Sequence, residues 1–136
     1  NEYKANAEEM SIRFDYDVSV PQNLGFTAVD LYVLLGNTLD NAIEAVEKFE
    51  EAEKRQIDVM IHRQKNFLVM NFINPIPEKL KFDDEFPVTT KKDKKYHGFG
   101  LRSIQHFVKK YDGVLNISEE DGCFSLKIMI PILHKK

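Results

Sequence analysis

LLGNTLDNAIEA, residues 34–45, decides the fold because it forms the centre of a long helical pattern over residues 29–50. Apolar residues recur there at steps of four, three, four and three, which is the spacing of one buried stripe on an α-helix. The members of this stripe are Leu35, Leu39, Ala42, Val46 and Phe49. The stretch therefore predicts an amphipathic helix, which Thr27 or Asp30 would cap.

The opposite side of this helix is polar, and Asn37 and Asn41 lie on it one turn apart, followed by Glu44 and Lys48. Residues one turn apart lie above one another, so the two carboxamides share one face. Asparagine and the neighbouring Gly36 are poor helix formers, with glycine costing about 1 kcal/mol relative to alanine. Two interpretations follow. The pair is kept for chemistry, since a carboxamide oxygen can bind a Mg²⁺ whose other ligands are water and phosphate, or it belongs to a solvated polar face.

Composition describes a single ordinary globular domain of 136 residues, with a formal charge of −3 that does not favour nucleic acid as a partner. One cysteine, Cys123, excludes an intrachain disulfide, and we expect its thiol to be buried. No apolar run reaches the length of a membrane span, and no signal peptide is visible. Because the chain starts at Asn1, we expect a fragment of a longer protein in which residues 1–10 are the remnant of a preceding helix.

Alternating apolar residues predict strands at residues 11–18, 56–62, 67–73, 114–118 and 123–131, the third of them central. Residues 63–66 and 119–122 are the predicted hairpin turns. A second amphipathic helix opens at Gly98 and stops at Gly113; its buried stripe is predicted to be Leu101, Ile104, Val108 and Tyr111. The order of elements predicts an α/β two-layer sandwich, with a mixed sheet covered on one face by helices.

Residues 78–97 lack a convincing period and are rich in charge, which is typical of a lid or binding loop. Gly98 and Gly100 follow it at a loop-to-helix junction, where exposed first-turn amides attract phosphate. The lysines of the loop, among them Lys91, would screen phosphate charge or simply be solvated. His97, beside the glycines, is the histidine with the best chance of touching phosphate, and we interpret His62, His106 and His134 as ordinary.

Asn74 ends the central predicted strand, because Pro75 and Pro77 cannot donate to a ladder. Its amide both donates and accepts, so it could bind the edge of an adenine. The alternative is an asparagine that forms the turn before a proline. The residues alone leave both interpretations open.

Taken together, these motifs resemble those of the GHKL ATP-binding superfamily. NTLDNA, residues 37–42, resembles the N box of sensor histidine kinases, and HGFGL, residues 97–101, resembles their G2 box. TTK, residues 89–91, precedes the second motif. A similar tripeptide stands at this place in the quorum-sensing peptide-receptor kinases, which the chain resembles. The resemblance covers nearly the whole chain from Ser11 to Ile130.

The resemblance implies a catalytic domain that binds ATP and Mg²⁺. Asn41 would ligate the metal and Asn37 would support the phosphates, which makes this pair the catalytic residues. The nucleotide-binding residues would be Asn74, Lys91, His97, Gly98, Gly100 and Leu101, with residues 78–97 as the ATP lid. The usual adenine motif, Asp-x-Gly-x-Gly, is replaced by Asn74-Pro75-Ile76-Pro77, so Asn74 would stand in for the aspartate.

Hydrolytic members of the superfamily carry a glutamate where Asn37 stands, and an amide cannot activate water. The resemblance therefore implies a protein histidine kinase, inactive without a dimerisation domain that holds the acceptor histidine. The implied partners are that domain and a response regulator, within a membrane-anchored homodimer whose kinase domain is cytoplasmic. A serine kinase acting on a regulatory protein and a degenerate interaction module are the alternatives.

Overall fold

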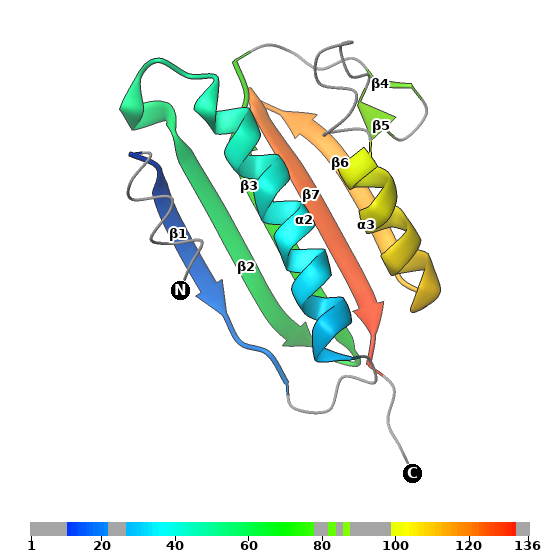
Figure 1. Ribbon diagram of the computed structural model, residues 1–136. Coiled ribbons are helices and arrows are strands. Elements are labelled where there is room, and N and C mark those ends of the chain that lie inside the picture. The colour runs from blue at the N-terminus through cyan, green and yellow to red at the C-terminus, as the bar shows by residue number, and fades with distance from the viewer. Residues whose placement is uncertain (1–10, 22–26, 78–81, 84–85, 88–98, 133–136) are drawn as a thin grey trace.

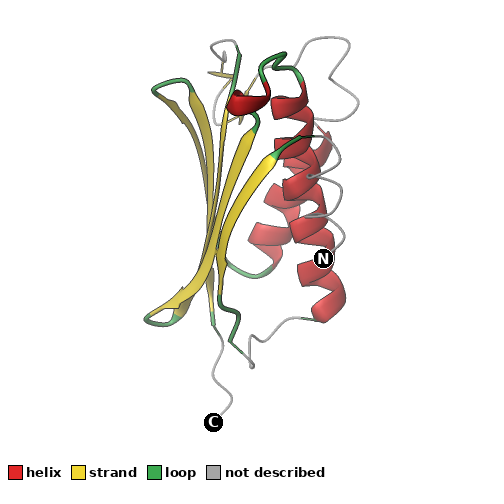
Figure 2. Ribbon diagram, turned by 90° about the vertical axis from the view of Figure 1, so that its left-hand side faces the viewer, coloured by secondary structure: helices red, strands yellow, loops and turns green. Residues whose placement is uncertain are grey.

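The computed structural model describes residues 11–21, 27–77, 82–83, 86–87 and 99–132. Within these residues a five-stranded sheet carries two helices on one of its faces (Figures 1 and 2). The strand order is β1-β2-β3-β7-β6. The bounds are β1 Arg13–Val18, β2 Gln56–Gln64, β3 Phe67–Pro75, β6 Val114–Glu120 and β7 Cys123–Pro131, with helices α2 Ala28–Glu47 and α3 Phe99–Lys110. The predicted two-layer α/β sandwich is confirmed.

The sheet is mixed because α2 returns the chain to pair β2 parallel to β1, whereas every other pairing in it is antiparallel. β3 lies in the middle, as its continuous apolar character predicted. Its residue Met70 is paired with Ile61 on one side and Ile128 on the other. All three side chains are at most 2% exposed, so the centre of the sheet is also the centre of the core.

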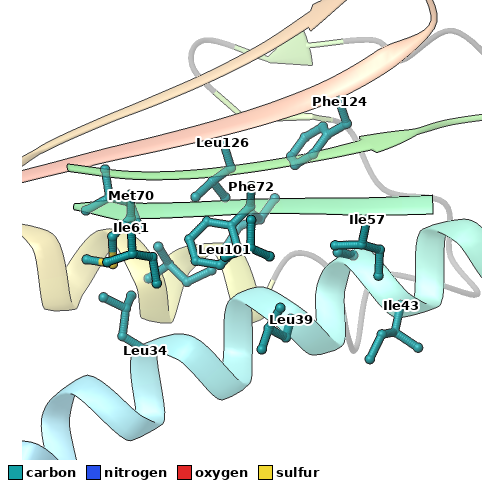
Figure 3. Packing of buried hydrophobic residues seen from close by; sticks show 14 of the residues in the cluster. Leu34, Leu39, Ile43, Ile57, Ile61, Met70, Phe72, Leu101, Phe124 and Leu126 are labelled. Carbon is teal, nitrogen blue, oxygen red and sulfur yellow. The ribbon is translucent and has the colours of Figure 1, made fainter. Parts of the chain in front are cut away.

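The core lies between the sheet and the two helices, and Figure 3 shows the side chains that fill it. Leu34 and Val46 of α2 are 1% and 0% exposed, and Leu101 and Ile104 of α3 are 2% and 0% exposed. Burying each such side chain contributes about 1.5–3 kcal/mol. These contacts fix the rotation of each helix about its axis, and so they decide which side chains of α2 point towards α3.

The ends of α2 follow from local hydrogen bonds. Thr27 is the N-cap, and its hydroxyl accepts from the Asp30 amide at 3.0 Å. The helix stops at Glu47 rather than at residue 50, and a short 3-10 helix, η1 (Ala52–Lys54), follows. Arg55 donates from Nε to the Phe49 carbonyl at 2.9 Å, which holds this connection before β2 begins.

β3 is longer than predicted, because it continues through Asn74 and Pro75 instead of ending at residue 73. Asn74 is paired with Phe124 and Pro75 with Cys123. Pro75 is tolerated because the pairing with β2 has already ended at Ile73, so no amide is missed on that side. Asn74 is therefore a strand residue facing the core.

Several smaller expectations are corrected. Cys123, Tyr111 and Leu35 are half-buried rather than buried, and the neighbouring Leu34 is the fully buried leucine at that place in α2. The predicted turns are shorter, since β2 runs to Gln64 and strands β6 and β7 approach to within two residues. Asp121 and Gly122 make that turn with φ of 52° and 76°. Within residues 78–97, the described residues include two short paired strands, β4 (Phe82–Asp83) and β5 (Phe86–Pro87).

Candidate functional site

One edge of α2 faces α3, and Asp30 identifies it. The Asp30 carboxylate accepts a hydrogen bond from the Tyr111 hydroxyl and lies 3.2 Å from the Lys110 ammonium, both at the end of α3. Asn37 and Asn41 lie seven and eleven residues further along α2. At 3.6 residues per turn these are close to two and three whole turns, which returns each side chain to within about 20° of Asp30. The two asparagines therefore point along the same edge.

The two helices run antiparallel, so the end of one lies beside the start of the other (Figure 1). Asn41 is eleven residues beyond Asp30, or about 16 Å at 1.5 Å per residue. Gly100 is ten residues before Lys110 on α3, or about 15 Å. Since Asp30 and Lys110 touch, Asn41 lies at the level where α3 begins. The structure thus brings Asn41 to the level of Gly100, which lies about sixty residues further along the chain.

The burial of this edge of α2 bears on the two interpretations of the asparagine pair. Asn37, Asn41 and Glu44 are each half-buried, whereas Lys48, just beyond the helix, is exposed. Thr38 is buried because its hydroxyl donates to the Leu34 carbonyl at 2.8 Å. A solvated polar face would leave all of these residues open to water. The observed half-burial of Asn37, Asn41 and Glu44 argues against a fully solvated face.

Asn74 lies at the same end of the domain, where β3 ends beside the start of β7 (Figure 1). It is 2% exposed, and only Thr38 shares with it the class of buried polar residues in the described part of the chain. Its Nδ2 donates to the Pro75 carbonyl at 3.0 Å. This local bond orients the amide and leaves its oxygen as the group suited to accept from a ligand.

The first turn of α3 supplies backbone amides without partners inside the helix, as every helix start does. No acidic residue lies in that turn, so its positive end is not compensated locally. The Leu101 side chain is 2% exposed and belongs to the core, so only the backbone of this residue can face a ligand. The other predicted nucleotide-binding residues, Lys91, His97 and Gly98, lie outside the described residues.

The two asparagines of the site offer neutral amide oxygens, and the Glu44 carboxylate lies half-buried on the same edge of α2. Within the described residues, no group of three or more His, Cys, Asp or Glu side chains could hold a metal by itself. Asp40 is the nearest acid in sequence to Asn41, and desolvation raises the pKa of its carboxyl. Amide oxygens of this kind fit Mg²⁺ when phosphate supplies the negative charge. The residues present therefore suit a magnesium–phosphate ligand better than a free ion.

Sequence reasoning missed the contact between Asp30 and the end of α3. Asp30 was visible only as a possible helix cap, and that role belongs to Thr27. Its partners Lys110 and Tyr111 lie 80 and 81 positions away, where no local pattern can indicate them. Tyr111, predicted in the buried stripe of α3, is only partly buried against the core, and its hydroxyl binds Asp30.

Comparison with known proteins places this geometry in a family. A family model described as the GHKL domain matches residues 26–131. The chain is 29% identical over 129 residues to the sensor histidine kinase FlgS of Helicobacter pylori, covering 91% of this chain and 33% of that protein. It is 30% identical over 114 residues to the sensor histidine kinase DpiB of Escherichia coli, covering 79% of this chain and 20% of that protein. The chain thus spans a third or less of these relatives.

Solved structures share the fold. The nucleotide-free catalytic domain of the histidine kinase ThkA superposes with a TM-score of 0.71 at 19% identity, over 96% of this chain and 86% of that chain. Full-length ShkA in complex with AMPPNP gives a TM-score of 0.70 at 17% identity, over 96% of this chain and 28% of that chain. At such identities the likeness concerns the fold alone. The family match over residues 26–131 shows that this chain belongs to the GHKL domain family.

Proposed function

We propose that this domain binds Mg-ATP and transfers the γ-phosphate to a histidine on a separate dimerisation domain of the same sensor kinase. The observation that carries the proposal is the position of Asn37 and Asn41. They are half-buried, lie on the edge of α2 that faces α3, and reach the level where α3 begins. Membership of the GHKL family and the likeness to sensor histidine kinases support the same assignment.

In this proposal each residue acts on one part of the nucleotide. Asn41 holds the metal and Asn37 hydrogen-bonds to the phosphates. The backbone at Gly98 and Gly100 approaches the phosphates closely, with Lys91 and His97 of the lid adding positive charge. Mg²⁺ supplies charge neutralisation across the phosphate oxygens. Asn74 accepts a hydrogen bond from the exocyclic amine of adenine, a role that its buried and oriented amide suits.

The residue type at position 37 favours transfer over hydrolysis. The hydrolytic members that the chain resembles carry a glutamate where Asn37 stands, and an amide does not take a proton near neutral pH. Phosphoryl transfer depends chiefly on positioning and charge stabilisation. A nucleophile held in line on another domain supplies the missing part, so the isolated domain binds ATP and turns it over only slowly.

The rest of the protein belongs to the proposal as well. The chain spans a third or less of the sensor histidine kinases that it matches, and we propose that an acceptor domain, a sensor and a separate response regulator complete the system. We infer a membrane-anchored homodimer with this domain in the cytoplasm. In the part of the chain that the structure describes, no helix is both long and apolar enough to cross a membrane.

The test is incubation with ATP labelled at the γ-position, with and without an added dimerisation domain of the same protein. We expect acid-labile phosphate on the added domain and little free phosphate in either reaction. Robust release of free phosphate by this chain alone would indicate a hydrolytic member of the family. Acid-stable phosphate on a partner would indicate a serine kinase, and the absence of nucleotide binding would indicate an interaction module.

A further inference from the structure

α2 and α3 are joined at one end by a polar cluster of Asp30, Lys110 and Tyr111, which we call the helix tie. The Tyr111 hydroxyl and the Lys110 ammonium both bind the same Asp30 oxygen, the ammonium at 3.2 Å. The Asp30 backbone amide is already used by Thr27 at the helix cap. The Asp30 side chain thus reaches the end of α3, while its backbone amide completes the cap of α2.

The helix tie is favourable on electrostatic grounds that go beyond its contacts. Asp30 lies in the first turn of α2, where an anion suits the helix dipole, and Lys110 lies in the last turn of α3, where a cation does. The Tyr111 ring is held by Phe107, with ring centroids 5.0 Å apart and the Phe107 side chain in the core. The Lys110 ammonium lies 5.4 Å from the Tyr111 ring centroid. Each member is thus positioned by at least one further contact.

The end of α3 that carries the helix tie is also fixed to the sheet. The Gly113 amide donates to the Val108 carbonyl at 2.8 Å, which closes the last turn. A Cβ atom at Gly113 would come within 2.6 Å of the Met129 carbonyl oxygen, so the backbone there packs directly on β7. This end of α3 therefore cannot shift relative to α2 without breaking directional contacts.

The other end of the same helix pair carries the candidate site. Both helices also pack apolar side chains such as Leu34 and Ile104 into the shared core, and such contacts are not directional. Hydrogen bonds and ion pairs constrain position more sharply. Because a helix is a rigid rod, a slide of α3 at the helix tie would move Gly100 past Asn41 by the same amount. A displacement of about 1 Å is enough to impair a site that depends on positioning.

We propose that Asp30 is a positioning residue for the phosphate end of the nucleotide site, through its contacts with Tyr111 and Lys110. The helix tie sets the axial register of α3 on α2, and this register decides how far the first-turn amides of α3 lie from the Asn41 carboxamide. Asn74, on β3, is not held by the helix tie. The inference rests on the proposed function, because it concerns the same nucleotide.

The experiment compares affinities for Mg-ATP and for adenosine in Asp30→Asn and Tyr111→Phe. Asparagine keeps the shape of Asp30 without its charge, and phenylalanine keeps the ring contact with Phe107 without the hydroxyl. We expect each variant to bind Mg-ATP about tenfold more weakly while adenosine binding stays unchanged. A variant that only lowers the folded fraction would weaken both ligands by one common factor.

Phe14→Leu is the matched control, since Phe14 packs on the core from β1, on the opposite edge of the sheet from α3. It should lower the melting temperature and leave the ratio of the two affinities unchanged. An unchanged ratio in Asp30→Asn and Tyr111→Phe would overturn the inference and leave the proposed function intact. If the unmodified chain binds neither ligand, the proposed function fails and the inference fails with it. Should Asp30→Asn not fold, Lys110→Gln tests the same tie from the other helix.

Discussion

Tyr111 donates a hydrogen bond to Asp30 across 81 positions of sequence, and this bond makes stability depend on pH. The bond, together with the Lys110 ammonium, lowers the pKa of the Asp30 carboxyl below its ordinary 3.8. The same bond and burial raise the pKa of the Tyr111 hydroxyl above its ordinary 10.0, against the opposing charge of Lys110. The contribution of Asp30 is therefore present above its unfolded pKa and lost as pH falls through the lower folded value. The contribution of Tyr111 is present below its unfolded pKa and lost as pH rises through the higher folded value.

We predict that Asp30→Asn makes the free energy of unfolding less dependent on pH at both extremes. Urea unfolding of the two proteins, from about pH 7 down to about pH 3 and up to about pH 11, measures this dependence. The unmodified chain should lose more stability than the variant at each end. Parallel curves for the two proteins would show that the bond does not contribute to folding in solution.

Asn41→Ala should remove magnesium-dependent nucleotide affinity without unfolding the domain. We expect about a tenfold loss for Mg-ATP, while ATP in the presence of a chelator binds as before. Alanine is the better helix former by about half a kcal/mol, so the melting temperature should stay level or rise. Calorimetric titration with and without Mg²⁺ measures the effect. Glu47→Ala, on the exposed side of the same helix, is the control, and an equal loss there would remove the metal assignment.

Asn74 can be tested with two substitutions of similar shape. Asn74→Asp keeps an acceptor oxygen for the adenine amine and should retain adenosine binding. Asn74→Leu removes both polar groups and should weaken adenosine and ATP by the same factor. Both leave the Pro75 carbonyl without its donor, at a cost of about 1–3 kcal/mol in the free energy of unfolding. Fluorescence titration with adenosine separates them, and equal affinity in the two variants would argue that adenine is recognised elsewhere.

Gly113 and Gly122 should respond differently to the same replacements, for different physical reasons. Gly122 has φ of +76° with open space around it, so alanine there costs about 1 kcal/mol and asparagine, which tolerates this conformation, costs less. Gly113 lacks room for a Cβ beside Met129, so alanine and asparagine should both cost about 1–3 kcal/mol. Thermal unfolding of the four variants provides the comparison. A Gly113→Ala protein as stable as the parent would contradict the packing of the α3 end on β7.

Helices α2 and α3 and the five strands of the main sheet could be predicted from sequence because each is encoded by a local period, whereas η1, β4 and β5 could not. The alternation Phe124, Leu126, Ile128 and Ile130 predicts a half-buried strand, and all four side chains are at most 7% exposed. Contacts between elements that are distant in sequence are not encoded by a local period. The extension of β3 through Pro75 depends on where β2 stops, and the contact of Asp30 with Tyr111 depends on how two helices pack.

The same distinction holds for the candidate site: its residues could be identified from sequence, but their burial could not. Asn37 and Asn41 could be identified from their spacing and from a motif, yet the residues alone left open whether they were solvated. The answer depends on which edge of α2 faces α3, and buried side chains such as Leu34 and Ile104 decide that. Predictions for Lys91, His97 and Gly98 stay predictions, since these residues lie outside the described ranges.

The central claim is that one end of the α2–α3 pair holds Mg-ATP, and a titration followed by amide chemical shifts tests it most directly. The account predicts saturable shifts at Asn37, Asn41, Gly100 and Asn74, stronger with Mg²⁺ than without. Residues of the uncovered sheet face, such as Asp15, Asp58 and Met60, which line a shallow hollow there, should not respond. Shifts confined to that hollow, or no shifts at millimolar Mg-ATP, would contradict the account.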